Sequence, residues 1–371
     1  MSRLFEPLAL GALALPNRII IAPMCQYASK DGCANDWHRV HLGHLALSGA
    51  GLLILEATGV SAEGRISPQC LGLYSDENEA ALAETLKSVR AVSSMPLAIQ
   101  LGHAGRKGSS RSPFEGGAQI APDEPGGWRT VAPSAIGHAD TDEPPLALDE
   151  AGLARVKADF VASALRAARL GFDGIELHMA HGYLLHQFLS PLSNRRNDAY
   201  GGGIEGRMRF PMEVFEAVRA ALPAELPVWV RVSASDWAEG GIEVEEIAAL
   251  SRALEAAGCA AVHVSSGGVS AAQQIPVGPG YQVHLAEAVK EAVSIPVFAV
   301  GLITEPAHAE EIVATGKVDA VALARAFLWN PRWGWHAAAA LGAKVEGPKQ
   351  YWRSAPAGVT PPFIGFAHGQ R

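Results

Sequence analysis

Two histidines and a tyrosine stand together where an apolar run ends, in DGIELHMAHGYLLHQFLSP (173–191). His178 and His181 are three residues apart, and Tyr183 follows two residues later. Such a pair could hold a metal, donate hydrogen bonds to a substrate oxygen, or be hydrogen-bonded structure. A metal site is disfavoured because the sequence has no HExxH spacing and no further ligand beyond the distant His186. On a single helical turn, two side chains three apart would face the same way and could address one oxygen.

Strands and helices that could position these side chains are visible along the chain. Short apolar runs recur eight times, at 18–22, 52–56, 97–101, 173–177, 228–232, 261–265, 296–300 and 319–323. Their nearly continuous apolarity is typical of parallel strands covered on both faces. Segments with helical periodicity lie between most of them, among them 34–50, 148–171 and 242–258. The alternation predicts an α/β fold, a (β/α)8 TIM barrel formed as a single domain by residues 1–371.

Two segments fall outside this alternation. Residues 102–148 are rich in Pro, Gly and Asp and follow the third strand, so we expect a long loop that caps the mouth of the barrel. Residues 343–371 form a C-terminal tail with Tyr, Trp and Phe but no periodicity. We expect this tail to pack on its own barrel or on a neighbouring subunit.

Composition excludes several classes of protein. The 371 residues are 49% hydrophobic with a net charge of −8 and no block of basic residues, which argues against a nucleic-acid partner. The most apolar region, 45–60, contains Glu56 and several glycines, so no membrane span is expected. The four cysteines lack CxxC spacing, which argues against zinc-ribbon and iron–sulfur sites. We expect a cytoplasmic protein with reduced thiols.

Polar residues collect where the predicted strands end, as they do at the catalytic face of barrel enzymes. In chain order they are Ala22-Pro23-Met24-Cys25-Gln26-Tyr27, Glu56-Ala57-Thr58, Gln100, the His178/His181/Tyr183 group, Arg231, Ser265-Ser266, Gly301 and Ala324-Arg325.

These residues lie in stretches that resemble a known family, the Old Yellow Enzymes, and more narrowly its thermophilic-like bacterial subclass of FMN-dependent ene reductases. The stretches are APMCQY (22–27), DWHRVHLGHLALSGAGLLILEAT (36–58), IQLGHAGRK (99–107), IELHMAHGYLLHQFLSPLSNRRNDAYGG (175–202), Arg231 and QYWR (350–353). They run through nearly the whole chain in the expected order, which makes the resemblance far more specific than a single short motif.

The resemblance implies roles for the residues around the substrate. His178 and His181 match the pair that binds the substrate carbonyl oxygen, where two donors would stabilise the negative charge that develops during reduction. Tyr183 resembles the donor of a proton to Cα, although water could replace it. Cys25 matches the cysteine against the flavin ring, which tunes the redox potential, and Tyr27 the residue that lines the substrate pocket.

The resemblance also implies how FMN is held. Gln100 matches the residue at the pyrimidine edge of the ring, and Arg231 the cation near N1 and O2. Ala22, Pro23, Met24, Cys25 and Ala57 would lie along the ring. Gly301, Ala324 and Arg325 would bind the phosphate. Two departures from the usual pattern are Ala324, where many relatives have glycine, and Met179 within the histidine motif.

Two further clusters have ambiguous meaning. His38, His41 and His44 recur every three residues, but they precede the second strand, so we interpret them as the polar face of a helix and not as a metal site. Arg353, in QYWR, matches an arginine that the subclass inserts into a neighbour's active site. The resemblance therefore implies a homodimer or homotetramer whose substrate pocket is completed in trans.

These observations predict an FMN-dependent, NADPH-oxidising ene reductase that acts on activated alkenes by a ping-pong cycle. Two alternatives stay open. One is a flavin-binding redox sensor that uses Cys25. The other is a TIM-barrel lyase or isomerase without flavin, for which Lys107 and Glu56 are the nearest catalytic candidates.

Overall fold

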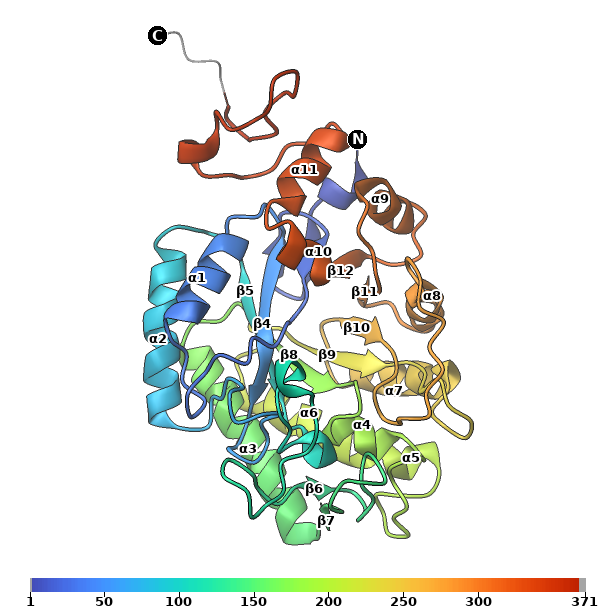
Figure 1. Ribbon diagram of the computed structural model, residues 1–371. Helices are drawn as coiled ribbons and strands as arrows, with labels where there is room; N and C mark the ends of the chain where they lie inside the picture. Colours follow the sequence, from blue (N-terminus) through green and yellow to red (C-terminus); the bar gives the residue numbers. More distant parts are fainter. Residues whose placement is uncertain (1, 367–371) are drawn as a thin grey trace.

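A closed barrel of eight parallel strands forms the centre of the protein in the computed structural model, which describes residues 2–366 (Figure 1). In order around the barrel from the first, the strands are β3 (Ile19–Ile21), β4 (Leu52–Gly59), β5 (Leu97–Gly102), β8 (Gly174–Met179), β9 (Val228–Ser233), β10 (Val262–Ser265), β11 (Val297–Ala299) and β12 (Ala320–Leu323). Each predicted apolar run overlaps one of these strands, so the predicted TIM barrel is confirmed.

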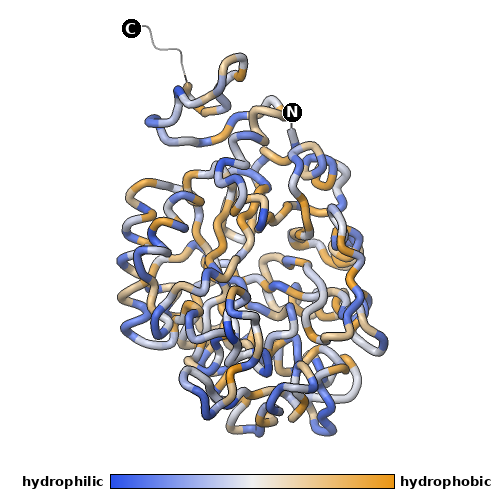
Figure 2. The backbone as a smooth tube through the Cα atoms, viewed as in Figure 1, coloured by the Kyte–Doolittle hydropathy of each residue, from blue (hydrophilic) through white to orange (hydrophobic). Residues whose placement is uncertain are grey.

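The barrel closes because the strands are apolar on both faces. Nearly every residue of the eight strands is buried, between the barrel interior and the surrounding helices. Figure 2 shows the central strands as largely hydrophobic segments surrounded by more hydrophilic loops. All eight pairings are parallel, and β12 pairs with β3 to close the ring. Because parallel strands share one direction, their carboxyl ends meet at one mouth.

Helices surround the barrel and follow most of its strands. They are α1 (Asp36–Leu45), α2 (Asp76–Arg90), α3 (Glu150–Arg169), α4 (Leu184–Leu189), α5 (Ile204–Arg207), α6 (Arg209–Ala221), α7 (Val244–Ala256), α8 (Val283–Ala292), α9 (Pro306–Ala314), α10 (Arg325–Trp329) and α11 (Trp333–Ala340). Three of the longer helices begin at side-chain caps, in which Asn35, Ser75 and Asp149 accept hydrogen bonds from the first helical turn.

The segment 102–148 is ordered mainly by contacts with the mouth of the barrel. It contains two short strands that pair with each other, β6 (Val131–Ala132) and β7 (Leu146–Ala147). The Arg106 guanidinium donates to the carbonyl oxygen of Val269, beyond β10, at 2.6 Å. Lys107 Nζ donates to the carbonyl oxygen of Gly268 in the same region. The segment therefore ties the end of β5 to the loop after β10.

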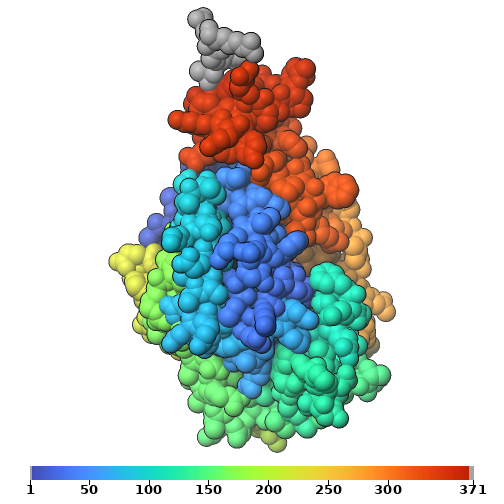
Figure 3. Space-filling view, turned by 60° about the vertical axis from the view of Figure 1, so that its left-hand side comes forward, coloured from blue at the N-terminus to red at the C-terminus, as the bar shows by residue number. Residues whose placement is uncertain are grey.

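The C-terminal tail packs on its own chain as far as the structure describes it, and residues 367–371 lie outside the described residues. Val345 and Phe363 form a bridge and pack with Trp335 of α11 in a small separate apolar cluster. The Arg332 guanidinium lies 4.8 Å from the Trp335 ring centroid. Figure 3 shows the tail as a projection at the end of the molecule that carries α11.

The remaining elements are a hairpin and four short turns. Strands β1 (Leu8–Leu10) and β2 (Leu13–Leu15) form a hairpin, and short 3-10 turns occupy Arg3–Phe5, Gly105–Lys107, Pro113–Glu115 and Lys349–Tyr351. Within residues 2–366, no helix has the length and apolarity needed to cross a bilayer. The same residues contain no group of three or more His, Cys, Asp or Glu side chains arranged to hold a metal ion.

Candidate active site

The mouth of the barrel contains a cavity of about 200 Å³ at the ends of β9 to β12. Its walls include five residues that the sequence predicted: His181, Arg231, Gly301, Ala324 and Arg325. Tyr281, Gln282 and Thr304 complete much of the lining. A second, smaller cavity adjoins β4, β5 and β8 and is lined by Ala57, His178 and Tyr183. The strand ends therefore bring most of the predicted residues to one mouth.

The two predicted histidines meet, but not on a helical turn as expected. His178 belongs to β8, and His181 lies in the following turn with a left-handed backbone, φ 57°. The His178 Nε2 and His181 Nδ1 atoms are 3.4 Å apart, and the ring planes are nearly perpendicular at 88°. The pairing comes from a strand that ends in a tight turn, so the helical spacing argument was wrong about the cause.

Hydrogen bonds around the pair assign the imidazole protons. The Ala180 N–H donates to His178 Nδ1 at 3.2 Å, which leaves the proton on His178 Nε2, facing His181. The Ser265 hydroxyl donates to Gln282, so it accepts from His181 Nε2 at 2.8 Å. Burial, followed by the charge of Arg231, holds the pKa of both imidazoles well below the ordinary value of 6.5. Both rings are therefore neutral hydrogen-bond donors near pH 7.

Tyr183 lies beside the histidine pair. Its ring stacks edge-on against His178, with 4.9 Å between centroids. Burial, and then the nearby Cys25, Tyr27 and Cys70 side chains, raise the pKa of the Tyr183 phenol well above 10. The phenol therefore keeps its proton at neutral pH and can donate it.

Lys107 and His186 hold the turn that carries His181. Lys107 Nζ donates to the carbonyl oxygens of His181 and Gly268, both at 2.8 Å. The Gly182 N–H donates to His186 Nδ1 at 2.8 Å. An added Cβ on Gly182 would lie 2.1 Å from the Gly268 oxygen, so only glycine fits there.

A carboxylate in the barrel interior organises the floor of the site. Glu176 accepts from Gln100 Nε2 at 2.7 Å and from Trp229 Nε1 at 2.8 Å, and His263 Nδ1 lies 2.8 Å from it. Because the Gln100 amide nitrogen is occupied by Glu176, its oxygen is the atom left to face a ligand. The buried Arg231 interacts electrostatically with Glu176. Arg231 Nε is buried with no hydrogen-bond partner among the described residues.

Cys25 follows β3 at the mouth and contacts a second thiol. A side-chain hydrogen bond with Cys70 is the largest cause, and burial the next, of a Cys25 pKa well above its ordinary value. The next-but-one residue, Tyr27, has φ 51°, which is unusual for a bulky side chain. Burial, and then the charges of nearby groups, raise the pKa of Tyr27 well above its ordinary value of 10. Electrostatic interactions connect Cys25 with Tyr183 and Arg231.

Some predicted residues lie elsewhere. The side chains of Ala22 and Met24 line a small cavity between α1 and β4, while Pro23 lies between them. Arg353 is exposed in the tail and does not line either mouth cavity of its own chain. The interpretation of the α1 histidines as a polar helix face was wrong for two of them, because His38 and His41 are buried against β4.

Sequence reasoning missed several residues that shape the site: Glu176, Asp236, His263, Tyr281 and Gln282, and the thiol contact of Cys70. For Glu176 a signal existed. It is a charged residue within an apolar strand and lies two positions before His178, so both point to the same face of β8. The others have no local signal, because their partners are far away in the sequence.

Comparisons with known proteins agree with this geometry. Residues 3–342 match the NADH:flavin oxidoreductase / NADH oxidase family. The chain is 42% identical over 352 residues to an NADPH dehydrogenase of Geobacillus thermodenitrificans, covering 94% of this chain and 98% of that protein. It is 41% identical over 354 residues to an NADPH dehydrogenase of Halalkalibacterium halodurans, covering 95% and 98%.

Solved structures also resemble this chain. Morphinone reductase superposes with a TM-score of 0.78 at 29% identity, covering 100% of this chain and 98% of that one. A 2-naphthoyl-CoA reductase complex gives 0.80 at 24% identity, which concerns the fold alone, and this chain spans 51% of that longer protein. The family match, the relatives and the barrel together establish that the chain belongs to the NADH:flavin oxidoreductase / NADH oxidase family and is an oxidoreductase of the Old Yellow Enzyme type.

Proposed function

We propose that this protein is an FMN-dependent ene reductase that uses NADPH to reduce the C=C bond of activated alkenes, including α,β-unsaturated ketones and aldehydes, maleimides and nitro compounds. The observation that carries the proposal is the convergence of two neutral imidazoles with a protonated phenol at one barrel mouth. NADPH is favoured as reductant by the bacterial relatives, which are named NADPH dehydrogenases. We expect the reaction to take place in the cytoplasm.

The residues at the mouth fit a flavin mononucleotide. The buried Arg231 Nε has no partner in the described chain and suits an anionic ring edge. Gln100 presents an amide oxygen, which suits a ring N–H. Gly301, Ala324 and Arg325 line the cavity of about 200 Å³ next to Arg231 and suit a phosphate. A bound flavin would supply hydride chemistry, accepting hydride from NADPH and delivering it to the β-carbon of the alkene.

The chain's own residues then bind and protonate the substrate. The Nε2–H of His178 lies on the side of the ring that faces His181. His181 becomes a second donor if a substrate oxygen attracts its proton to Nδ1, since the two tautomers of a neutral imidazole are close in energy. Donors held in place stabilise negative charge on the substrate oxygen more strongly as reduction proceeds. Tyr183, or water, donates the proton to Cα.

An anaerobic absorbance titration tests the proposal. NADPH is added to the purified protein while the flavin band near ~450 nm is followed, and 2-cyclohexenone is added afterwards. We expect bleaching by NADPH and recovery with the enone. A colourless protein that added FMN does not turn yellow would exclude the flavin function.

A flavin-binding redox sensor is the second candidate, because the Cys25 and Cys70 thiols are in contact. It predicts bleaching without recovery by any alkene. The non-flavin lyase or isomerase is less well supported. Its candidate Lys107 donates to two backbone carbonyls, and its candidate Glu56 accepts a backbone hydrogen bond from Gln26.

We also infer that the working form is a homodimer or homotetramer in which Arg353 reaches a neighbouring active site. Its support is the exposure of Arg353 on a tail that otherwise packs on α11. Light scattering coupled to size-exclusion chromatography measures the oligomer. Arg353→Ala should then raise the KM for the enone without changing flavin content; an unchanged KM would remove Arg353 from the site.

A further inference from the structure

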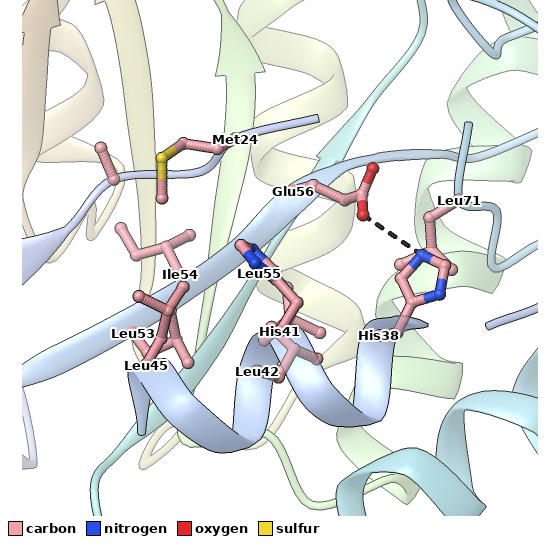
Figure 4. Close-up of a pocket in the computed structure, with 11 residues that line it drawn as sticks. Met24, His38, His41, Leu42, Leu45, Leu53, Ile54, Leu55, Glu56 and Leu71 are labelled. Atoms are coloured by element: carbon pink, nitrogen blue, oxygen red, sulfur yellow. Dashed lines mark ion pairs between the residues drawn. The ribbon is translucent and has the colours of Figure 1, made fainter. Parts of the chain in front are cut away.

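Glu56 occupies an irregular position in strand β4. Leu55 pairs with Ile99 of β5 and Ala57 pairs with Gln100, so Glu56 is the extra residue of a β-bulge. A bulge breaks the alternation of side chains and can redirect one of them. Figure 4 shows the Glu56 carboxylate pointing towards α1, where His38 faces it. Both side chains line a cavity of about 10 Å³. A buried carboxylate in this place is costly unless it is paired, so its partners matter.

The first partner is His38. The Asn35 N–H donates to His38 Nδ1 at 3.1 Å, and the Asn35 side-chain oxygen lies 3.1 Å from the same nitrogen. The other ring nitrogen, Nε2, faces the Glu56 carboxylate, which favours the tautomer with the proton there. That atom lies 3.4 Å from Glu56 Oε1, and the His38 and Glu56 side chains are 2% and 4% exposed. The opposite tautomer would direct a nitrogen lone pair at the carboxylate. The Nε2–H is not aligned for a hydrogen bond, so His38 stabilises Glu56 as a buried polar neighbour.

The second partner is the backbone beside Cys25. The Gln26 N–H donates to Glu56 Oε2 at 3.0 Å, so the carboxylate connects α1 to the segment between Cys25 and Tyr27. Two further hydrogen bonds run in parallel from the start of α1. Asn35 Nδ2 donates to the Ala28 carbonyl at 2.6 Å, and Trp37 Nε1 donates to Gln26 Oε1 at 3.1 Å.

These contacts lie next to a residue with an unusual backbone conformation. Tyr27 has φ 51°, a conformation that a bulky residue adopts only where its surroundings enforce it. The hydrogen bond from the preceding residue, Gln26, to Glu56 is placed to enforce it. If that hydrogen bond were lost, the segment could relax and move both Cys25 and Tyr27 away from the mouth.

The charge of Glu56 also affects the Cys25 thiol. Besides the Cys70 hydrogen bond and burial, the charge of Glu56 is among the causes that raise the pKa of Cys25. Tyr27, Tyr183 and Arg231 also interact electrostatically with Cys25. Among these groups that interact with the Cys25 thiol, Glu56 is the carboxylate.

We propose that His38 and Glu56 form a positioning pair that holds the Cys25–Tyr27 segment at the barrel mouth, and that the Glu56 carboxylate, bound to the amide that follows Cys25, lowers the reactivity of the Cys25 thiol beside the flavin. The inference rests on the proposed flavin function for its catalytic meaning. Neither residue touches the substrate.

Three variants of the full-length, flavin-loaded protein test the pair. Glu56→Gln removes the charge but keeps an acceptor for Gln26. His38→Leu removes the polar neighbour, and His38→Gln replaces Nε2–H with an amide N–H. Asp236→Asn is the matched control, because it breaks another buried His–carboxylate pair remote from Cys25. Alkylation of each cysteine by iodoacetamide is followed by peptide mass spectrometry between about pH 6.5 and 10.5, the range in which thiols ionise.

For Glu56→Gln we expect the midpoint of the Cys25 profile to move down by roughly one pH unit, because a nearby negative charge has been removed. The profile of Cys33 should be unchanged. The midpoint potential of the flavin, measured by dye equilibration, should become more positive. His38→Leu should lower the rate of enone reduction about tenfold through displacement of the segment, and His38→Gln should restore much of it.

Two results would overturn the inference. One is faster alkylation of all cysteines in Glu56→Gln with an unchanged Cys25 midpoint, which would mean that the pair contributes only ordinary packing. The other is an equal shift of the Cys25 midpoint in Asp236→Asn. The proposed function fails separately. If the wild type bleaches and recovers in the titration but Glu56→Gln matches it in midpoint and potential, the function stands and the pair has no such role. If the wild type binds no FMN, the proposed function fails, although the Cys25 profile still tests the Glu56 charge.

Discussion

His186 Nε2 lies 3.0 Å from Asp236 Oδ1, and both side chains are fully buried beneath the turn that carries His181. The other nitrogen, His186 Nδ1, accepts the Gly182 N–H at 2.8 Å, so the proton stays on Nε2, the atom next to the carboxylate. Asp236 thereby fixes the imidazole, and the imidazole fixes the backbone next to His181. Through this series of contacts, the position of the buried carboxylate determines the position of His181, the residue proposed to face the substrate.

Asp236→Asn should destabilise the protein by about 3 kcal/mol at pH 7, in the range found when one partner of a buried pair is removed. The Ser190 hydroxyl and the Ile242 N–H both donate to Oδ2, so an asparagine must keep its oxygen there. Its amide nitrogen then faces the proton of His186. Urea unfolding of both proteins measures the difference.

The pH dependence of that difference has a definite sign. Burial would raise the pKa of Asp236, but His186, Ser190 and the Ile242 amide together hold it below its ordinary value of 3.8. The stabilisation is therefore complete above the pKa of the unfolded chain, about 3.9, and it is lost as the pH falls through the lower folded pKa. The two proteins should converge in stability below about pH 4; a constant gap down to pH 2 would contradict this assignment.

Glu176→Gln should weaken FMN binding roughly tenfold, in line with the free energy of a hydrogen bond to a charged group. In the wild type, Gln100 Nε2 donates to Glu176 at 2.7 Å, which directs the Gln100 oxygen to the ligand. An amide at position 176 would favour the flipped Gln100, whose nitrogen would then face the ring N–H. Quenching of FMN fluorescence measures the dissociation constant.

Trp229→Phe is the matched control for Glu176, because it removes one donor to the carboxylate and leaves the charge and Gln100 in place. It should cost stability with little change in FMN affinity. Equal weakening in both variants would mean that general packing, and not the orientation of Gln100, is responsible.

Lys107 should give the protein a distinctive alkaline stability profile. Burial, and then the charge of Arg106, lower the Lys107 pKa from 10.5 to about 8. Between these two values the unfolded chain binds a proton that the folded chain does not, so stability rises with pH. Relative to Lys107→Met, the wild type should gain up to about 3 kcal/mol across this window. Lys87→Met, at an exposed site on α2, should show no such change.

Much of the fold could be predicted from the sequence because the barrel depends on local patterns. All eight apolar runs overlap barrel strands, since each strand is buried on both faces and its apolar sequence can be recognised without knowing its partners. The histidine pair was also predicted, but for the wrong reason. The rings come together because His181 has a left-handed backbone and is followed by Gly182, a position where only glycine fits.

What the sequence did not reveal depends on distant partners. The spacing of the α1 histidines predicts a polar surface, yet a bulge in β4 turns Glu56 towards α1 and makes His38 its buried neighbour. Cys70 is ordinary in sequence and acquires meaning only because it contacts Cys25. Periodicity describes which face of an element is buried, and it carries no information about which buried polar groups will meet.

The double variant His178→Ala with His181→Ala should lower enone reduction by about 10³-fold, the scale seen when oxyanion donors are removed. Flavin content and reduction by NADPH should change little, because the residues proposed to bind FMN, among them Arg231 and Gln100, remain. Stopped-flow absorbance separates the two half-reactions. Tyr183→Phe is the contrasting variant, and it should slow only the enone step, by less if water supplies the proton. Unchanged enone turnover in the double variant would remove the polarising role.

The same pair predicts a pH profile. Since burial and Arg231 keep the pKa of both imidazoles well below 6.5, the rings stay neutral donors on either side of that value. The wild-type rate of enone reduction should therefore show no inflection near pH 6.5. An inflection there that disappears in the double variant would mean that a charged imidazole takes part, and the site would then work by proton transfer from histidine instead of by neutral hydrogen bonding.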